Sequence, residues 1–131
     1  MLIDTSGWYC LFDDADSRNP KALNFYQSAE FRWTHSFCID ELVALLEARK
    51  QNRARSLNFI LDILNDSEIQ IVWVDEELVR RGMELLLNRP DKSWSLCDSV
   101  SFMIMGDERF IEALTTDHHF KQAGFIQLLE S

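Results

Sequence analysis

The chain has 131 residues, which suits one ordinary domain and is too short for two. Its 13 basic and 22 acidic residues give a formal net charge of −9. This charge argues against an extended nucleic-acid-binding surface, because lysine and arginine make most contacts to phosphates. The apolar stretches are shorter than the roughly 20 residues that a membrane-spanning helix needs. We therefore expect a single domain covering residues 1–131, with no membrane segment.

In the first half of the chain, short apolar runs alternate with segments whose apolar residues are spaced as on one face of a helix. Short apolar runs predict strands, and apolar residues three and four positions apart predict helices. In chain order, the patterns predict a strand at 1–4, a helical stripe through Trp8, Leu11 and Phe12, a loop at 13–20, a helix at 21–30, a strand at 31–34 and, capped by Ser36, a long helix through Ile39, Leu42, Val43 and Leu46.

The same alternation continues in the second half. A β-branched, apolar run at 69–74 is the strongest strand signal in the chain. In order, the patterns predict a helix through Leu57, Ile60, Leu61 and Leu64, that strand, a helix from Asp75 to near Pro90, a helix from Ser95 through Ile104, a strand at 113–116, a short helix at 117–123 and a last strand at 125–129. Alternating strands and helices indicate an α/β fold with a central, mainly parallel sheet of four to five strands flanked by helices.

Four acidic residues follow predicted strands or open predicted helices. Asp4 ends the first strand, Asp117 follows the strand at 113–116, and Glu41 and Asp98 lie in the first turns of two helices. In parallel sheets, sites form outside the carboxyl ends of the strands, so these four side chains are expected to converge. Clustered carboxylates repel one another unless a cation binds, and carboxylate oxygens suit Mg²⁺ or Mn²⁺.

Each of these acids also has a purely structural interpretation. Asp4 and Asp117 are plausible helix N-caps, and Ser95 with Asp98 fits a capping box. Glu41 fits a role as a partner of the helix dipole. Spacing alone leaves the metal site and these structural roles evenly balanced.

Four short motifs resemble those of the PIN-domain family and appear in the family order. The first is Leu2-Ile3-Asp4-Thr5-Ser6, and the second is Ile39-Asp40-Glu41-Leu42. The last two are the more specific: residues 94–102 (WSLCDSVSF), and residues 113–120 (ALTTDHHF) with Ala-Gly-Phe at 123–125. Together the motifs span nearly the whole chain.

This resemblance implies a PIN fold and endoribonuclease activity that depends on Mg²⁺ or Mn²⁺, with Asp4, Glu41, Asp98 and Asp117 as metal ligands and catalytic residues. Ser6 and Thr116, at hydroxyl-bearing positions of the motifs, would orient the acids through hydrogen bonds. Many relatives carry a further acid two residues after the fourth, where this chain has His119. Compact members of the family are often the toxin of a type II toxin–antitoxin pair, so an RNA substrate, a small antitoxin protein and a homodimer are the partners that follow.

The main alternative is a catalytically silent PIN-like module that binds RNA or a protein partner. A phosphatase of the haloacid dehalogenase type would need an acid at the position of Ser6 and is discounted. Three scattered cysteines without metal-ligand spacing (Cys10, Cys38 and Cys97) favour reduced thiols in a cytoplasmic protein.

The sequence also predicts the position of several basic, aromatic and histidine side chains. The basic stretch of Arg49, Lys50, Arg53 and Arg55 is either a contact for RNA or an acidic partner, or a solvated helix end. The remaining expectations are a core position for Trp73, a place at the rim of the site for Trp94, exposed positions for His118 and His119, and either partner contact or core burial for Phe25, Phe59 and Leu85.

Overall fold

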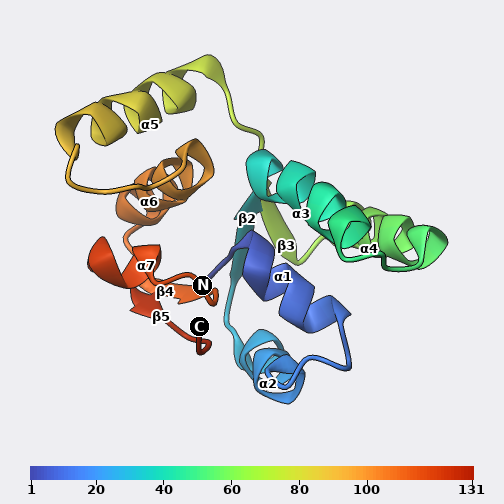
Figure 1. Ribbon diagram of the computed structural model, residues 1–131. Coiled ribbons are helices and arrows are strands. Elements are labelled where there is room, and N and C mark those ends of the chain that lie inside the picture. The colour runs from blue at the N-terminus through green and yellow to red at the C-terminus, as the bar shows by residue number, and fades with distance from the viewer.

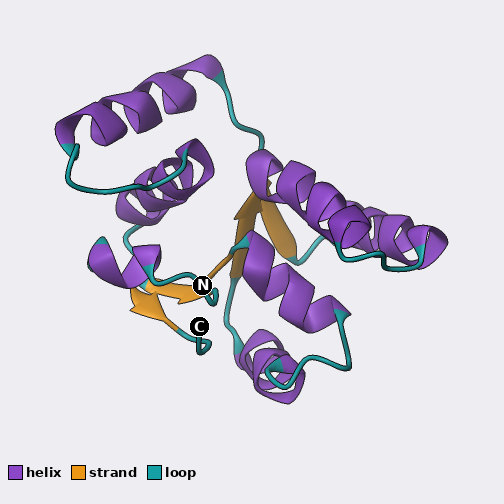
Figure 2. Ribbon diagram, viewed as in Figure 1, coloured by secondary structure: helices purple, strands orange, loops and turns teal.

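The computed structural model describes residues 1–131 and contains one sheet of five parallel strands. The strands lie in the order β3–β2–β1–β4–β5, so the chain starts in the middle of the sheet and builds outward to both edges (Figure 2). The α/β fold with a parallel sheet is thus confirmed. The strand bounds are β1 (Leu2–Ile3), β2 (Arg32–His35), β3 (Ile69–Val72), β4 (Glu112–Leu114) and β5 (Ile126–Gln127).

Seven helices cover the two faces of this sheet (Figure 1). Helices α1 to α4 pack against one another on one side, and α5 to α7 lie on the other, where α5 packs along α6. The bounds are α1 (Thr5–Phe12), α2 (Asn19–Ser28), α3 (Ser36–Ala48), α4 (Arg53–Asn65), α5 (Glu76–Asn88), α6 (Leu96–Glu108) and α7 (His119–Gln122).

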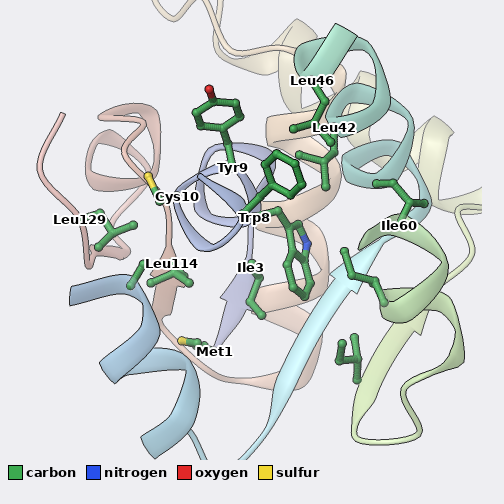
Figure 3. Packing of buried hydrophobic residues seen from close by; sticks show 14 residues of the cluster. Met1, Ile3, Trp8, Tyr9, Cys10, Leu42, Leu46, Ile60, Leu114 and Leu129 are labelled. Carbon is green, nitrogen blue, oxygen red and sulfur yellow. The ribbon is translucent and has the colours of Figure 1, made fainter. Parts of the chain in front are cut away.

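Neighbouring residues of the central strands supply two separate cores. Successive side chains of a strand point to opposite faces. Ile3 and Leu114 accordingly belong to the core beneath α1 to α4, whereas Leu2 and Ala113 belong to the core beneath α5 to α7. Figure 3 shows the first core, in which Trp8 of α1 lies among aliphatic side chains from the strands and from α3 and α4. Helices therefore bury both faces of the sheet, as is usual for a parallel sheet.

Helix α1 packs unusually close to strand β4. A β-carbon placed on Gly7 would lie 2.0 Å from the carbonyl oxygen of Leu114, so no other residue fits at this position without movement. The backbone N–H of Asp4 donates a 3.2 Å hydrogen bond to the same carbonyl. This contact fixes the end of β1 against the end of β4, which is where two of the predicted site residues lie.

Two expectations for tryptophan were wrong. Strand β3 ends at Val72, one residue before Trp73, and β3 is an edge strand, so the Trp73 side chain is 66% exposed. Trp94 is instead buried, where its ring packs against Phe102 and its Nε1–H donates a 3.0 Å hydrogen bond to Gln122 Oε1. Trp94 is a core residue of the α6 side and leaves the rim of the site to other side chains.

Candidate metal centre

Asp4 lies at the carboxyl end of β1 and is 5% exposed. Although it occupies the N-cap position of α1, its side chain makes no capping hydrogen bond. Its carboxylate instead accepts hydrogen bonds from Thr115 Oγ1 at 3.0 Å and, more weakly, from Ser6 Oγ at 3.5 Å and Cys38 Sγ at 3.6 Å. The plain N-cap interpretation is therefore wrong for Asp4, which points toward other elements.

Burial governs the charge state of Asp4. Desolvation raises its pKa well above the usual value, and the neighbouring Cys38 and Asp98 raise it further, while hydrogen bonds from Thr5 N–H and Thr115 act in the opposite direction. An aspartate that is desolvated and adjacent to a second acid carries an electrostatic cost that a bound cation removes.

Asp98 forms the capping box that the sequence allows and also contacts His119. Ser95 Oγ accepts from the Asp98 backbone N–H, and Asp98 Oδ2 accepts from the Ser95 N–H, each at 3.0 Å, which completes the capping box of α6. The same Oδ2 lies 2.9 Å from His119 Nδ1. Because the capping box holds the side chain in one orientation, Asp98 faces the site in a fixed position.

Asp117 follows β4 and is joined to Asp98 by a histidine. Asp117 Oδ1 accepts a 2.9 Å hydrogen bond from the backbone N–H of His119, as expected of a residue that opens a short helix. The His119 ring lies between the two acids, with Nδ1 3.3 Å from Asp117 Oδ1. His118 is exposed, as expected, but the expectation that His119 is exposed was wrong, because its side chain is mostly buried between the acids.

Glu41 reaches the site from the second turn of α3. It accepts a 3.1 Å hydrogen bond at Oε1 from Thr5 Oγ1, next to Asp4 in the chain. Glu41 stands one helical turn after Cys38, which itself contacts Asp4, so both lie on the face of α3 that meets the end of β1. Desolvation of the inner part of its side chain raises the pKa of Glu41, although the residue as a whole is exposed.

The supporting hydroxyls are only partly those that the motifs suggest. Ser6 Oγ lies 3.1 Å from Thr115 Oγ1 and accepts a hydrogen bond from the Thr116 backbone N–H at 2.9 Å. Thr116 takes part through its backbone N–H and its carbonyl, which accepts from Gln127 Nε2 at 3.1 Å, whereas the hydroxyl that donates to Asp4 belongs to Thr115. Thr115 Oγ1 also accepts from the Asp117 N–H at 3.0 Å and thereby ties Asp4 to Asp117.

The charges of the four acids are not balanced by any lysine or arginine. The only nitrogen-bearing side chains at these acids are His118, which contacts Asp117, and His119, which contacts Asp98 and Asp117. Asp4 and Glu41 have no such partner. A donor set of carboxylate oxygens with hydroxyl groups behind it fits a hard divalent cation. The residues present thus suit the metal ion that the motifs imply.

The basic stretch after α3 lies away from this centre. The guanidinium of Arg49 packs on the Tyr9 ring, that of Arg55 packs on the Phe12 ring and donates to the Phe12 carbonyl, and Arg53 pairs with Glu47. Arg55 thus joins the start of α4 to α1, Arg49 joins the end of α3 to α1, and Arg53 joins α4 to α3. Since an α-helix rises about 1.5 Å per residue, Arg49, at the end of α3, lies about 12 Å from Glu41 along the helix axis.

A parallel sheet of this order, with four acids at the carboxyl ends of its central strands, defines a class of metal-dependent nuclease-like domains. The family model described as PIN domain matches residues 1–126, and the chain belongs to the PIN-domain family. This confirms the resemblance that the sequence motifs indicate.

Two curated relatives and one solved structure are similar over almost the full chain. The relatives are described as 23S rRNA-specific endonuclease VapC20, from Mycobacterium tuberculosis strains CDC 1551/Oshkosh and ATCC 25618/H37Rv, and each is 24% identical over 129 residues, or 98% of this chain and 97% of the relative. The crystal structure of M. tuberculosis VapC20, described as a sarcin–ricin loop cleaving toxin, superimposes with a TM-score of 0.87 and 23% identity over 96% of each chain. The likeness in structure supports the fold. None of the helices is long and apolar enough to cross a membrane.

Proposed function

We propose that this chain is a metal-dependent endoribonuclease that hydrolyses phosphodiester bonds of RNA at the cluster of Asp4, Glu41, Asp98 and Asp117. The observation that carries the proposal is the convergence of four acids from four separate elements without a single lysine or arginine partner. Structural caps do not need to converge, and convergence without a countercharge is costly. Membership of the PIN-domain family and the endonuclease relatives support the same conclusion.

The four acids would hold Mg²⁺ or Mn²⁺. When bound, such an ion lowers the pKa of a coordinated water and neutralises charge on the phosphate oxygens. The protein's part is to position the carboxylates: Thr115 orients Asp4, the capping box orients Asp98, and the His119 ring spaces Asp98 from Asp117. A carboxylate that is held by such contacts is ready to accept a proton from water without first reorganising.

Two lysines provide a route for the RNA backbone. Lys21 and Lys121 line one cleft together with His118, which is adjacent to Asp117, and neither lysine forms an ion pair. Both are exposed. We infer that this cleft contacts RNA phosphates. Lys21→Gln and Lys121→Gln would each raise KM, leave kcat nearly unchanged, and reduce the slope of log affinity against log salt by about one.

We further propose that the chain is the toxin of a type II pair and acts in the cytoplasm, with a small antitoxin as its partner. The similar structure, VapC20, is that of a toxin, which supports this role. The three cysteines, all free and buried, are consistent with a reducing compartment. Exposed apolar side chains such as Trp73 and Leu87 (75% exposed) offer area for an antitoxin or a second copy of the chain. Phe25, Phe59 and Leu85, in contrast, pack against the two cores.

The deciding experiment is cleavage of labelled structured and single-stranded RNA in Mg²⁺, Mn²⁺ or EDTA. Asp98→Asn and Asp117→Asn should each lower the cleavage rate by on the order of 100-fold or more. Asp62→Asn, a change of the same kind at an exposed position on α4, is the matched control and should cleave at the wild-type rate. Equal cleavage by all four proteins would identify a contaminant. RNA binding without cleavage in any metal would support the catalytically silent module instead.

A further inference from the structure

Three soft donor groups meet in the core beside Asp4. His35 ends β2, Cys38 lies in the first turn of α3, and Cys97 lies in the first turn of α6. Their donor atoms all lie within 4.8 Å of one another, and the side chains are 0%, 0% and 6% exposed. His35 and Cys38 are three residues apart at the junction of β2 and α3, whereas Cys97 comes from α6 and joins them only in the folded protein.

The separations match the edges of a tetrahedral zinc site. Zn–S bonds of about 2.3 Å and Zn–N bonds of about 2.0 Å place two sulfurs about 3.8 Å apart and a sulfur and a nitrogen about 3.6 Å apart. Cys38 Sγ lies 3.8 Å from Cys97 Sγ and 3.3 Å from His35 Nε2. Asp4 Oδ1 lies 3.6 Å from Cys38 Sγ but is not among the donor atoms that all lie within 4.8 Å of one another, so the three groups leave the fourth position to water.

Packing alone does not satisfy His35. Its Nε2 contacts Ser101 Oγ at 2.8 Å as well as Cys38, but its Nδ1 has no hydrogen-bond partner although the residue is completely buried. A buried polar atom without a partner costs free energy, and almost every other buried side-chain polar atom in the protein has one.

We propose that His35, Cys38 and Cys97, with water as the fourth ligand, form a binding site for a thiophilic divalent cation such as Zn²⁺. Sulfur and imidazole ligands select Zn²⁺ over Mg²⁺, so this site differs in chemistry from the oxygen cluster beside it. Each thiol releases its proton to solvent on coordination. Because Asp4 contacts Cys38, a cation held by the thiolates lies close to the carboxylate cluster. Repulsion between the two cations therefore makes Zn²⁺ oppose binding of Mg²⁺ or Mn²⁺ at the carboxylates, a consequence that rests on the proposed nuclease function.

Cobalt titration of the reduced, EDTA-treated protein tests the site directly. Co²⁺ is a spectroscopic substitute for Zn²⁺ and should give one equivalent of binding, an intense thiolate-to-cobalt band in the near ultraviolet and the visible bands of a tetrahedral ion, all removed by added Zn²⁺. Cys97→Ser and Cys38→Ser should weaken binding by on the order of 100-fold or more. Cys10→Ser is the matched control, since Cys10 is equally buried but lies outside the cluster, and it should bind as the wild type does.

A second pair of measurements separates this site from the carboxylate cluster. Asp98→Asn should keep the thiolate band, whereas binding that shows only the weak spectrum of an oxygen-liganded ion overturns the proposal. If Cys38→Ser does not fold, as judged by circular dichroism, Cys97→Ser alone decides. Mn²⁺ binding followed by electron paramagnetic resonance should weaken at about one equivalent of Zn²⁺ in the wild type, whereas Cys97→Ser should need more Zn²⁺ for the same loss, because only direct competition at the carboxylates remains. Failure of RNA cleavage under all conditions would count against the nuclease and leave the cobalt result intact.

Discussion

Replacing Thr115 by valine tests whether one hydroxyl holds the centre together. Thr115 is completely buried, and its Oγ1 donates to Asp4 and accepts from the Asp117 N–H, each at 3.0 Å. Valine has nearly the same shape and lacks the hydroxyl. The change therefore leaves the packing at the end of β4 in place. It removes the only side-chain oxygen that is hydrogen-bonded to both Asp4 and Asp117.

The expected loss follows from the two groups that are left without this partner. A buried donor or acceptor without its partner costs about 1–3 kcal/mol. Ser6 Oγ, at 3.5 Å from Asp4 Oδ2, compensates in part, so we expect the free energy of unfolding to fall by about 2–4 kcal/mol. The hydrogen bond from Thr115 also opposes the rise in the pKa of Asp4. Its loss raises that pKa further, so half-maximal Mn²⁺ binding should move to higher pH.

Urea denaturation gives the stability, and Mn²⁺ titrations at several pH values give the binding. Thr116→Val is the matched control: the Thr116 side chain makes no hydrogen bond in the structure, and both the stability and the pH dependence should stay close to those of the wild type. Equal effects of the two substitutions, or a Thr115→Val protein that binds Mn²⁺ with unchanged pH dependence, would refute the assignment of Thr115 as the residue that positions Asp4.

Three further changes test the packing and the charge of the site. Gly7→Ala should lower the free energy of unfolding by about 3 kcal/mol or more, because the new methyl group meets a backbone carbonyl of β4, whereas Gly106→Ala, with open space around it, should raise it by about 0.5–1 kcal/mol in the same urea assay. Leu42→Ala should cost about 2–5 kcal/mol because this side chain is fully buried, and Leu61→Ala, at a position 52% exposed, should cost far less by thermal denaturation. Asp4→Asn should stabilise the protein in EDTA at neutral pH: the pKa of Asp4 is raised in the folded state, so its favourable contribution is complete below pH 3.8 and is lost as pH rises through the folded pKa. A difference between wild type and Asp4→Asn that does not grow with pH over this window would contradict that reasoning.

The order and type of the elements were predictable because burial imposes clear periodicity on this chain. The central strands are short, but they are apolar and alternate with helices that have one apolar face, so both kinds of element are visible in the sequence. The residues at which the elements begin and end were less predictable. Helix α2 begins at Asn19 and takes Pro20 into its first turn, where a missing N–H costs nothing, although Pro20 reads in sequence as the end of a loop.

The sequence predicts the four acids as candidate ligands, but it does not predict most of the groups that hydrogen-bond to them in the structure. Thr115 and Thr116 are chemically identical neighbours, and only the side-chain direction at the end of β4 decides which hydroxyl faces Asp4. His119 carries no recognisable ligand spacing, and its place between Asp98 and Asp117 depends on the approach of α7 to α6. Cys38 and Cys97 are 59 residues apart and meet only because two helices begin at the same edge of the sheet.

The acidity of the chain, which argued against nucleic-acid binding, is consistent with this site once the positions of the charges are known. Six arginines are already paired with acids, and two more pack on aromatic rings, so few cations remain to attract RNA over the surface as a whole. The unpaired Lys21 and Lys121 lie in the cleft next to Asp117. A divalent cation would add two positive charges among the four acids, beside that cleft. RNA would then be attracted chiefly where the metal is bound and repelled elsewhere, so binding should depend on the metal more steeply than in a basic nuclease.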